Sequence, residues 1–155
     1  MDQEKEFEEK VVQVNRVAKK TKGGNKIAFA VLMVVGDQKG RVGVGLGKAG
    51  EVLPAIKKGA KYAKKHLISI SLNGTTIPHQ IRIKKGAAEV FLKPASKGTG
   101  IVAGGAVRII LEAAGVKDVV AKILGSKNKI NNVYATMEAL KKLKTQNSKL
   151  KTNKD

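Results

Sequence analysis

The chain contains no cysteine, only two histidines and few aromatic residues. Without cysteine it can form no disulfide, no thiolate metal site and no cysteine nucleophile. His66 and His79 are too few and too far apart in sequence to predict a metal cluster, so both are interpreted as surface or edge residues. These absences exclude disulfide scaffolds and thiolate metal centres.

Long apolar stretches are also missing. The longest, Ile27 to Val35, has nine residues, whereas a membrane-spanning helix needs roughly 20. The acidic amino terminus is the opposite of the positively charged start of a secretory signal peptide. We therefore expect a soluble, cytoplasmic protein with no membrane partner.

Acidic residues are too scattered to predict a catalytic site. From Asp37 to Glu138 they stand singly, and no nucleophile has a base beside it in the sequence. Glu112 and Glu138 are interpreted as exposed helix positions. The chain is therefore predicted not to be an enzyme and to use no cofactor and no small-molecule substrate.

Basic residues, by contrast, are abundant. The formal net charge is +19, and from Lys10 onward 30 basic residues stand against 7 acidic ones, a balance of +23. No acidic residue lies between Glu51 and Glu89. Because such a surface repels itself, a permanent anionic partner is expected. Nucleic acid is the leading candidate; an anionic membrane surface is second to it and is not expected as the partner.

The scarcity of aromatic residues bears on the kind of nucleic acid. Aromatics make up 3% of the chain, tryptophan is absent, and Phe29 and Phe91 belong to no series of exposed rings. Modules that stack single-stranded bases on aromatic side chains are therefore disfavoured. Recognition of folded, double-helical RNA through phosphates and shape fits better.

The first half of the chain predicts an antiparallel β-β-β-α unit. Apolar alternation, turn glycines and a change to helical period at Glu51 place strands at 9–18, 27–35 and 41–47 and a helix from residue 51. Residues 67–72 could form a strand of either half. Packing the apolar helix face on one side of the sheet would leave the other side free.

The second half predicts an α/β unit. The pattern indicates a hairpin at 80–84 and 89–93, a helix at 103–114 ended by Gly115, a strand at 116–124 and a helix at 130–140. The expected organisation is α+β in two small domains. It comprises an acidic leader at 1–8, domains at 9–72 and 80–143 joined by a linker at 73–79, and a disordered tail at 144–155.

The stretch from Lys19 to Lys26 is a basic loop with two adjacent glycines between strand-like runs. Glycine allows positive φ at little steric cost, and lysines must point outward, so the loop is predicted to be a hairpin tip aimed at phosphate. The alternative is a solvated turn that happens to be rich in lysine.

The segment Gly45 to Gly50 matches the dinucleotide pattern G-x-G-x-x-G. That pattern requires a parallel βαβ unit and an acidic residue about 20 positions later, and neither is expected here. Gly47-Lys48 is followed by Ala49, so the hydroxyl of a phosphate-binding P-loop is missing too. The glycines are interpreted as allowing close approach to another backbone, of protein or of RNA.

The expected RNA-binding residues lie in the first strand and the basic loop after it, on and directly after the third strand, on the lysine face of the first helix and in a second basic glycine loop. They are Arg16, Lys19, Lys20, Lys22, Gly23, Gly24, Asn25, Lys26, Arg41, Lys48, Lys57, Lys61 and Lys97.

Twelve short motifs, spread in order over about residues 6 to 143, together resemble bacterial small-subunit ribosomal protein five. They are Glu8-Glu9-Lys10-Val11-Val12, Val14-Asn15-Arg16-Val17, Lys22-Gly23-Gly24, Val34-Val35-Gly36-Asp37, Gly40-Arg41-Val42-Gly43, Gly47-Lys48-Ala49, Pro54-Ala55-Ile56, Pro94-Ala95-Ser96, Gly98-Thr99-Gly100-Ile101, Ala103-Gly104-Gly105, Leu111-Glu112-Ala113-Ala114-Gly115 and Gly125-Ser126.

The resemblance implies a first domain similar to the double-stranded RNA-binding fold and a second α/β domain with a left-handed βαβ crossover. It implies binding to small-subunit rRNA, contacts with ribosomal proteins four and eight, a place near the path by which messenger RNA enters, and support of decoding accuracy. The loop from Lys19 to Lys26 would lie beside the spectinomycin site on the rRNA. Gly100 and Arg108 match positions at the contact with protein four.

Three residues depart from the family pattern, which usually has arginine at Asn25, proline at Lys129 and arginine at Tyr134. Asn25 lacks both the charge and the bidentate geometry of arginine. The phosphate contacts of the loop are therefore expected to depend on Lys20, Lys22, Lys26 and the glycine backbone.

Two other functions are compatible with parts of the sequence. A free-standing double-stranded RNA-binding regulator would use the first domain alone and bind duplexes of any sequence. A nucleotide-dependent enzyme would use Gly45 to Gly50 and be stabilised by a dinucleotide.

Overall fold

The structure, a computed structural model, describes residues 7–143 and contains two four-stranded sheets. The first has the order β1-β2-β3-β4 and is antiparallel, and the second has the order β5-β6-β8-β7, in which only β7 and β8 are parallel. This confirms an α+β chain with a β-β-β-α unit followed by an α/β unit. The strands are β1 (Glu8–Thr21), β2 (Gly24–Gly36), β3 (Arg41–Ala49), β4 (Ile68–Ser69), β5 (Ile81–Lys85), β6 (Ala88–Pro94), β7 (Ile101–Val102) and β8 (Val119–Ile123), and the helices are α2 (Val52–Lys65), α3 (Gly105–Ala114) and α4 (Lys129–Lys142).

The observed elements lie close to those predicted, with informative shifts. β1 begins at Glu8, inside the segment expected to be a leader, and Phe7 packs against the core beside α2. Residues 67–72, which were expected to form a strand of either half, supply β4, and β4 pairs with β3 of the first sheet. The connection β7-α3-β8 is a parallel βαβ crossover. The left-handedness of this crossover stays a prediction. Residues 1–6 and the tail at 144–155 lie outside the described residues.

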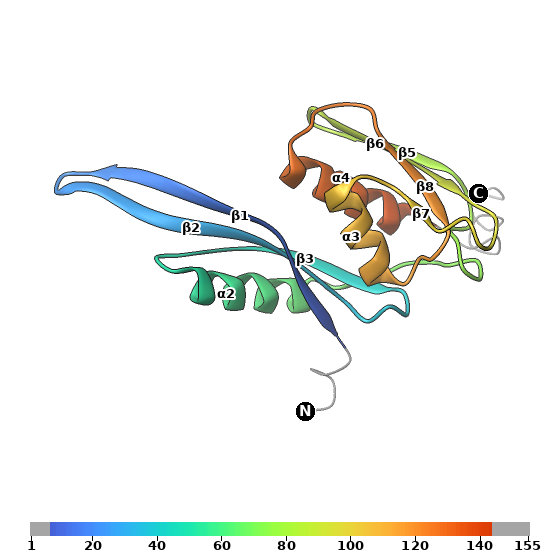
Figure 1. Cartoon of the computed structure of the whole chain (residues 1–155), viewed down its shortest axis with the longest axis horizontal. Helices are drawn as coiled ribbons and strands as arrows, with labels where there is room; N and C mark the ends of the chain where they lie inside the picture. Colours follow the sequence, from blue (N-terminus) through green and yellow to red (C-terminus); the bar gives the residue numbers. More distant parts are fainter. Residues whose placement is uncertain (1–6, 144–155) are drawn as a thin grey trace, which may run out of the picture.

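Both faces of the first sheet are covered, so the expectation of a free face was wrong. Val31, Met33 and Val35 pack against α2, whereas the alternate residues Leu32 and Val34 belong to the core that contains α3 and α4. Figure 1 shows α2 on one side of β2 and β3, with α3 and α4 on the other. A nine-residue apolar run is typical of a strand buried on both sides, and here each side has its own helical layer.

The turn between β2 and β3 fixes the two units to each other. The backbone N–H of Gln38 donates to the carbonyl oxygen of Ala113, and that of Gly40 donates to the carbonyl oxygen of Ala114. Both donor–acceptor distances are 2.9 Å. They thereby satisfy carbonyls at the end of α3 that have no partner within the helix. Gly115 ends that helix with φ of 94°, as predicted, and a side chain there would collide with the backbone of Gln38.

The connection between the units is also packed. Ile77 is fully buried, and the carbonyl oxygen of Thr75 accepts hydrogen bonds from the N–H groups of Lys117 and Asp118. The segment 73–79 is therefore bonded to the second unit and contributes Ile77 to the core that both units share.

Candidate nucleic-acid interface

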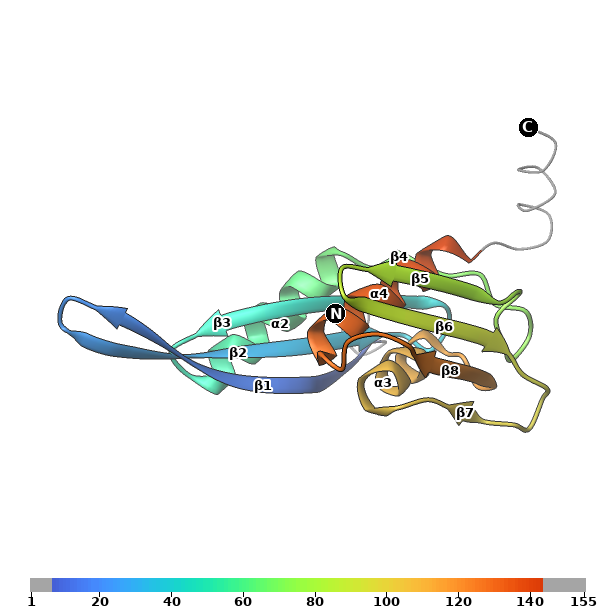
Figure 2. The same ribbon diagram turned by 90° about the horizontal axis from the view of Figure 1, so that it is seen from above.

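A two-stranded arm, residues 17–28, extends from the first sheet. β3 pairs with β2 only from Phe29 to Gly36, so β1 and β2 continue beyond that point as a pair. Thr21 pairs with Gly24 across the turn Lys22-Gly23, and Gly24 has φ of 124°, a conformation that glycine adopts readily. Figures 1 and 2 both show the arm projecting from the rest of the molecule.

The surface of the arm is cationic and carries no acidic residue. No aspartate or glutamate occurs from Lys10 to Gly36, and Lys20, Lys22 and Lys26 are exposed, as is Arg16 at the base of the arm. Gly23 and Gly24 are exposed at the tip, and the backbones of Lys19 and Asn25 lie in the paired strands beside it. The predicted basic hairpin tip is therefore present, and no acidic side chain from Lys10 to Gly36 opposes its positive potential.

The glycines of β3 let α2 lie directly on the sheet. A Cβ atom at Gly43, Gly45 or Gly47 would collide with the α2 backbone at Ala63, Gly59 or Ala55 respectively. The close approach inferred from the sequence is therefore to the chain's own helix. Because β3 is antiparallel to both neighbours, the parallel βαβ context of a dinucleotide site is absent from this sheet.

This packing turns the lysine face of α2 outward. Lys57 and Lys61 are exposed, and so is Lys48 near the end of β3. The carbonyl oxygen of Lys48 accepts a hydrogen bond from Lys58 Nζ at a distance of 3.2 Å. Lys64 differs from them because its Nζ lies 2.9 Å from Glu9 Oε1 on β1. The helix therefore exposes some of its lysines to solvent and uses another in an ion pair within the fold.

Arg41 is held by intramolecular contacts. Its Nε lies 2.8 Å from Asp37 Oδ2, and its guanidinium stacks 5.0 Å from the centre of the Phe7 ring. Burial, the largest single influence on Asp37, favours the neutral acid, but hydrogen bonds from the Lys39 N–H and from the side chain and N–H of Arg41 together lower its pKa. Arg41 therefore has a structural role in this turn.

The second basic loop is fixed by a buried carboxylate. Asp118 Oδ1 accepts the N–H groups of Gly98 and Gly100 at 3.1 and 2.9 Å. A hydrogen bond from Thr75 and those two N–H groups lower its pKa. Lys97 is exposed on this loop. The loop thus has a defined shape on the second sheet, at the opposite end of the molecule from the arm (Figure 1).

The two positions predicted to contact another protein lie together. Gly100 and Arg108 both line a surface hollow of about 520 Å³. Arg108 Nε lies 3.0 Å from Glu112 Oε1, and Glu112 Oε2 lies 3.5 Å from Lys10 Nζ on β1. The hydrogen bond from Arg108 is the main cause of the lowered pKa of Glu112.

The interpretation of Glu112 and Glu138 as exposed helix positions was wrong. Glu112 is partly buried and joins α3 to β1 through Lys10, and Glu138 is partly buried in a cleft between α2 and α4. Helical spacing alone could not identify Lys10 as the neighbour of Glu112, nor α2 as the other side of the cleft that contains Glu138. Both neighbours come from distant parts of the chain.

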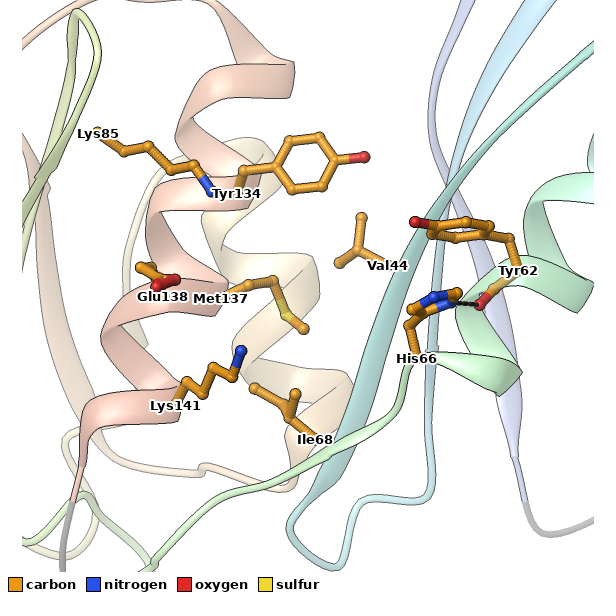
Figure 3. A pocket seen from close by; sticks show the side chains of 9 residues that line it. All are labelled: Val44, Tyr62, His66, Ile68, Lys85, Tyr134, Met137, Glu138 and Lys141. Atoms are coloured by element: carbon orange, nitrogen blue, oxygen red, sulfur yellow. Dashed lines mark hydrogen bonds between the residues drawn. The ribbon is translucent and has the colours of Figure 1, made fainter.

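The same cleft contains residues that the sequence analysis did not select. Tyr62 on α2 and His66 directly after its last turn face Tyr134 on α4, with Lys85 and Lys141 nearby (Figure 3). The spacing of Tyr62 and His66 by four residues predicts that they share one face of a helix. No local pattern relates them to Tyr134.

Within residues 7–143 there is no group of three or more histidine, aspartate or glutamate side chains able to hold a metal ion. No helix in the described part of the chain is long and apolar enough to cross a membrane.

Comparison with known proteins agrees with the resemblance over both units. Residues 7–71 match the profile described as "Ribosomal protein S5, N-terminal domain", and residues 83–153 match "Ribosomal protein S5, C-terminal domain". The "Small ribosomal subunit protein uS5" of Gloeobacter violaceus is 56% identical over 143 residues, which are 92% of this chain and 64% of that relative. This chain thus spans a little under two thirds of the relative's length. Since the two profiles follow in order and account for both sheets, the chain belongs to the ribosomal protein S5 family.

Proposed function

We propose that this protein is a structural constituent of the small ribosomal subunit in the cytoplasm and that it binds rRNA through the arm and the adjoining face of β3 and α2. The observation that carries the proposal is the acid-free arm, which places Lys20, Lys22 and Lys26 well away from the two cores. The name of the 56% identical relative supports the same assignment.

The arm suits phosphate binding for physical reasons. Its lysines neutralise phosphates and release counterions, and the exposed glycine turn lets the RNA backbone approach closely. Because β1 and β2 are continuous with a sheet packed on both sides, the base of the arm is rigid. It can therefore fix the position of an RNA helix relative to the rest of the protein.

The finer assignments rest on the family resemblance. We infer that Gly100 and Arg108 contact ribosomal protein four, because both line one hollow on the second unit. Contact with ribosomal protein eight, proximity to entering messenger RNA, and an arm beside the spectinomycin site are proposed on the same basis. Support of decoding accuracy would then follow from holding these neighbours in place, without catalysis by this chain.

Sedimentation tests the proposal directly. A tagged full-length chain expressed in its own cells should migrate with the small-subunit peak of a lysate and remain there after a wash that removes loosely bound proteins. Absence of the chain from that peak would refute the assignment.

A free-standing regulator that uses only the first unit is less consistent with the structure. Leu32, Val34, Val42 and Val44 of the first sheet belong to the core formed with α3 and α4, so the first unit on its own would expose them. Such a regulator would bind arbitrary duplex RNA as tightly as ribosomal RNA, which a competition assay would detect.

A further inference from the structure

The cleft between α2 and α4 gathers aromatic residues that are scarce elsewhere. The chain has two tyrosines and two histidines, and both tyrosines and His66 line this one cleft. Each side of the cleft comes from a different unit, since α2 follows β3 and α4 follows β8. The cleft therefore exists only in the assembled chain.

Its geometry is that of a slot with aromatic walls. The rings of Tyr62 and His66 are stacked, with centres 4.0 Å apart and planes inclined by 17°. Figure 3 shows the Tyr134 hydroxyl directed from α4 toward Tyr62, with Val44 between them. His66 Nδ1 lies 2.9 Å from the carbonyl oxygen of Tyr62, which orients the imidazole. Tyr62 remains 49% exposed, so part of its ring is open to a ligand.

The charges around the slot are mainly positive. Lys85 Nζ lies 5.7 Å from the centre of the Tyr134 ring, and Lys141 lines the same cleft. Glu138 is the single acidic residue among its lining side chains. The slot thus combines aromatic surface, tyrosine hydroxyls and one carboxylate with two ammonium groups.

We propose that this cleft binds one unpaired nucleotide of RNA, with its base against Tyr62 and its phosphate near Lys85 and Lys141. The proposal rests on the proposed RNA-binding function and adds a second, chemically different site to the arm. The tyrosine hydroxyls and the Glu138 carboxylate are suitable partners for the polar edge of a base.

Size and charge favour a nucleotide over other occupants. The cleft volume of about 180 Å³ is below the roughly 300–1,000 Å³ of sites for drug-sized ligands, so it suits one flat ring system. The two lysines would repel an arginine or lysine from a neighbouring protein. Folded RNA has few exposed aromatic faces, but bulged nucleotides supply them, and proteins commonly recognise these by stacking.

The test compares two RNA hairpins that differ in one nucleotide. One is fully paired, and the other carries a single bulged 2-aminopurine, whose fluorescence falls when it stacks. The arm should contribute equally to both affinities, so their ratio isolates the cleft. The full-length protein should bind the bulged hairpin about 5- to 150-fold more tightly, the range expected for one stacked base, and should quench its fluorescence.

Matched variants separate the cleft from the fold. Tyr62→Ala should reduce the affinity ratio to near one and abolish quenching without changing affinity for the paired hairpin. Tyr62→Phe keeps the ring and should retain most of the preference. Leu53→Ala, which truncates a 71% exposed side chain on the same helix outside the cleft, should change neither.

Each contrary result has a distinct meaning. Equal affinity of the unmodified protein for the two hairpins would overturn the nucleotide site while leaving the proposed RNA-binding function intact. A preference that survives Tyr62→Ala would place the bulge elsewhere and also overturn it. Binding to neither hairpin would contradict both this site and the proposed function.

Discussion

Gly45 shows how one missing side chain determines the position of a helix. A Cβ atom there would lie 2.7 Å from the Ala63 nitrogen and collide with the Gly59 carbonyl, so Gly45→Ala must push α2 away from β3. We expect a loss of about 1–3 kcal/mol in the free energy of unfolding, typical of overpacking, measured by denaturant titration. Gly50→Ala is the control, because nothing lies within 4 Å of its added methyl group. Equal losses for the two variants would contradict the packing argument.

Asp37 predicts a dependence of stability on pH. Its pKa is lowered in the folded protein, so its stabilisation is present above its unfolded pKa of about 3.9 and is lost as pH falls through the folded value. Asp37→Asn puts an amide N–H against Arg41 and should cost about 1–3 kcal/mol at pH 7. The difference between the variant and the unmodified protein should shrink below about pH 4.

Glu8→Gln is the control for that experiment. Glu8 is exposed on β1, and its carboxylate accepts a hydrogen bond from the exposed Gln38 amide over 3.1 Å. Its replacement should change unfolding by less than about 0.5 kcal/mol. A difference for Asp37→Asn that stays constant with pH would mean that the Asp37 carboxylate is not stabilised by its neighbours.

The arm should contribute to binding but little to stability, since a two-stranded extension buries little surface of its own. Lys20→Ala combined with Lys22→Ala should weaken RNA binding and reduce the salt dependence of affinity by up to about two ionic contacts, with the Tm nearly unchanged. Filter binding at several salt concentrations measures this. Asn25→Arg, which adds a charge at the same tip, should act in the opposite direction by about one contact.

A charge-matched control shows whether location matters. Lys39 and Lys117 are both exposed, and Lys39 lies in the turn at the other end of β2 from the arm (Figure 1). Replacing both with alanine removes the same net charge. If replacing Lys39 and Lys117 lowers the salt dependence as much as replacing Lys20 and Lys22 does, the attraction to RNA depends on net charge alone. The tip of the arm would then be a solvated turn that makes no phosphate contacts of its own.

The shared core predicts that the whole molecule unfolds as one unit. The four buried aliphatic residues that the first sheet contributes to this core are worth about 1.5–3 kcal/mol each, which together approaches the total stability of about 5–15 kcal/mol typical of a domain. Calorimetry of the full chain should show one transition, and a fragment of residues 1–72 should not fold cooperatively. Two separate transitions, or a fragment with the Tm of the full chain, would show that the units are independent.

Local sequence carried much of the architecture. Alternation, turn glycines and helical periodicity predicted the three strands of the first sheet, the β5–β6 hairpin and the end of α3 at Gly115, because each depends on residues close together in the chain. The lysines and adjacent glycines from Lys19 to Lys26 predicted a basic hairpin tip, because local charge and turn residues can be identified without knowledge of the fold. The short motifs spread along the chain indicated the family.

Only the tertiary structure decided which surfaces meet. The continuous apolar run of β2 is compatible with cover on both sides, but nothing in it names α3 and α4 as the second layer. The ion pair of Lys10 with Glu112 and the cleft that unites Tyr62 with Tyr134 join residues from the two units. These contacts depend on the hydrogen bonds from the β2–β3 turn to the end of α3 and on the glycines of β3, which allow α2 to pack directly on the sheet. Neither distance along the chain nor periodicity encodes them, because both describe neighbours in sequence and not neighbours in space.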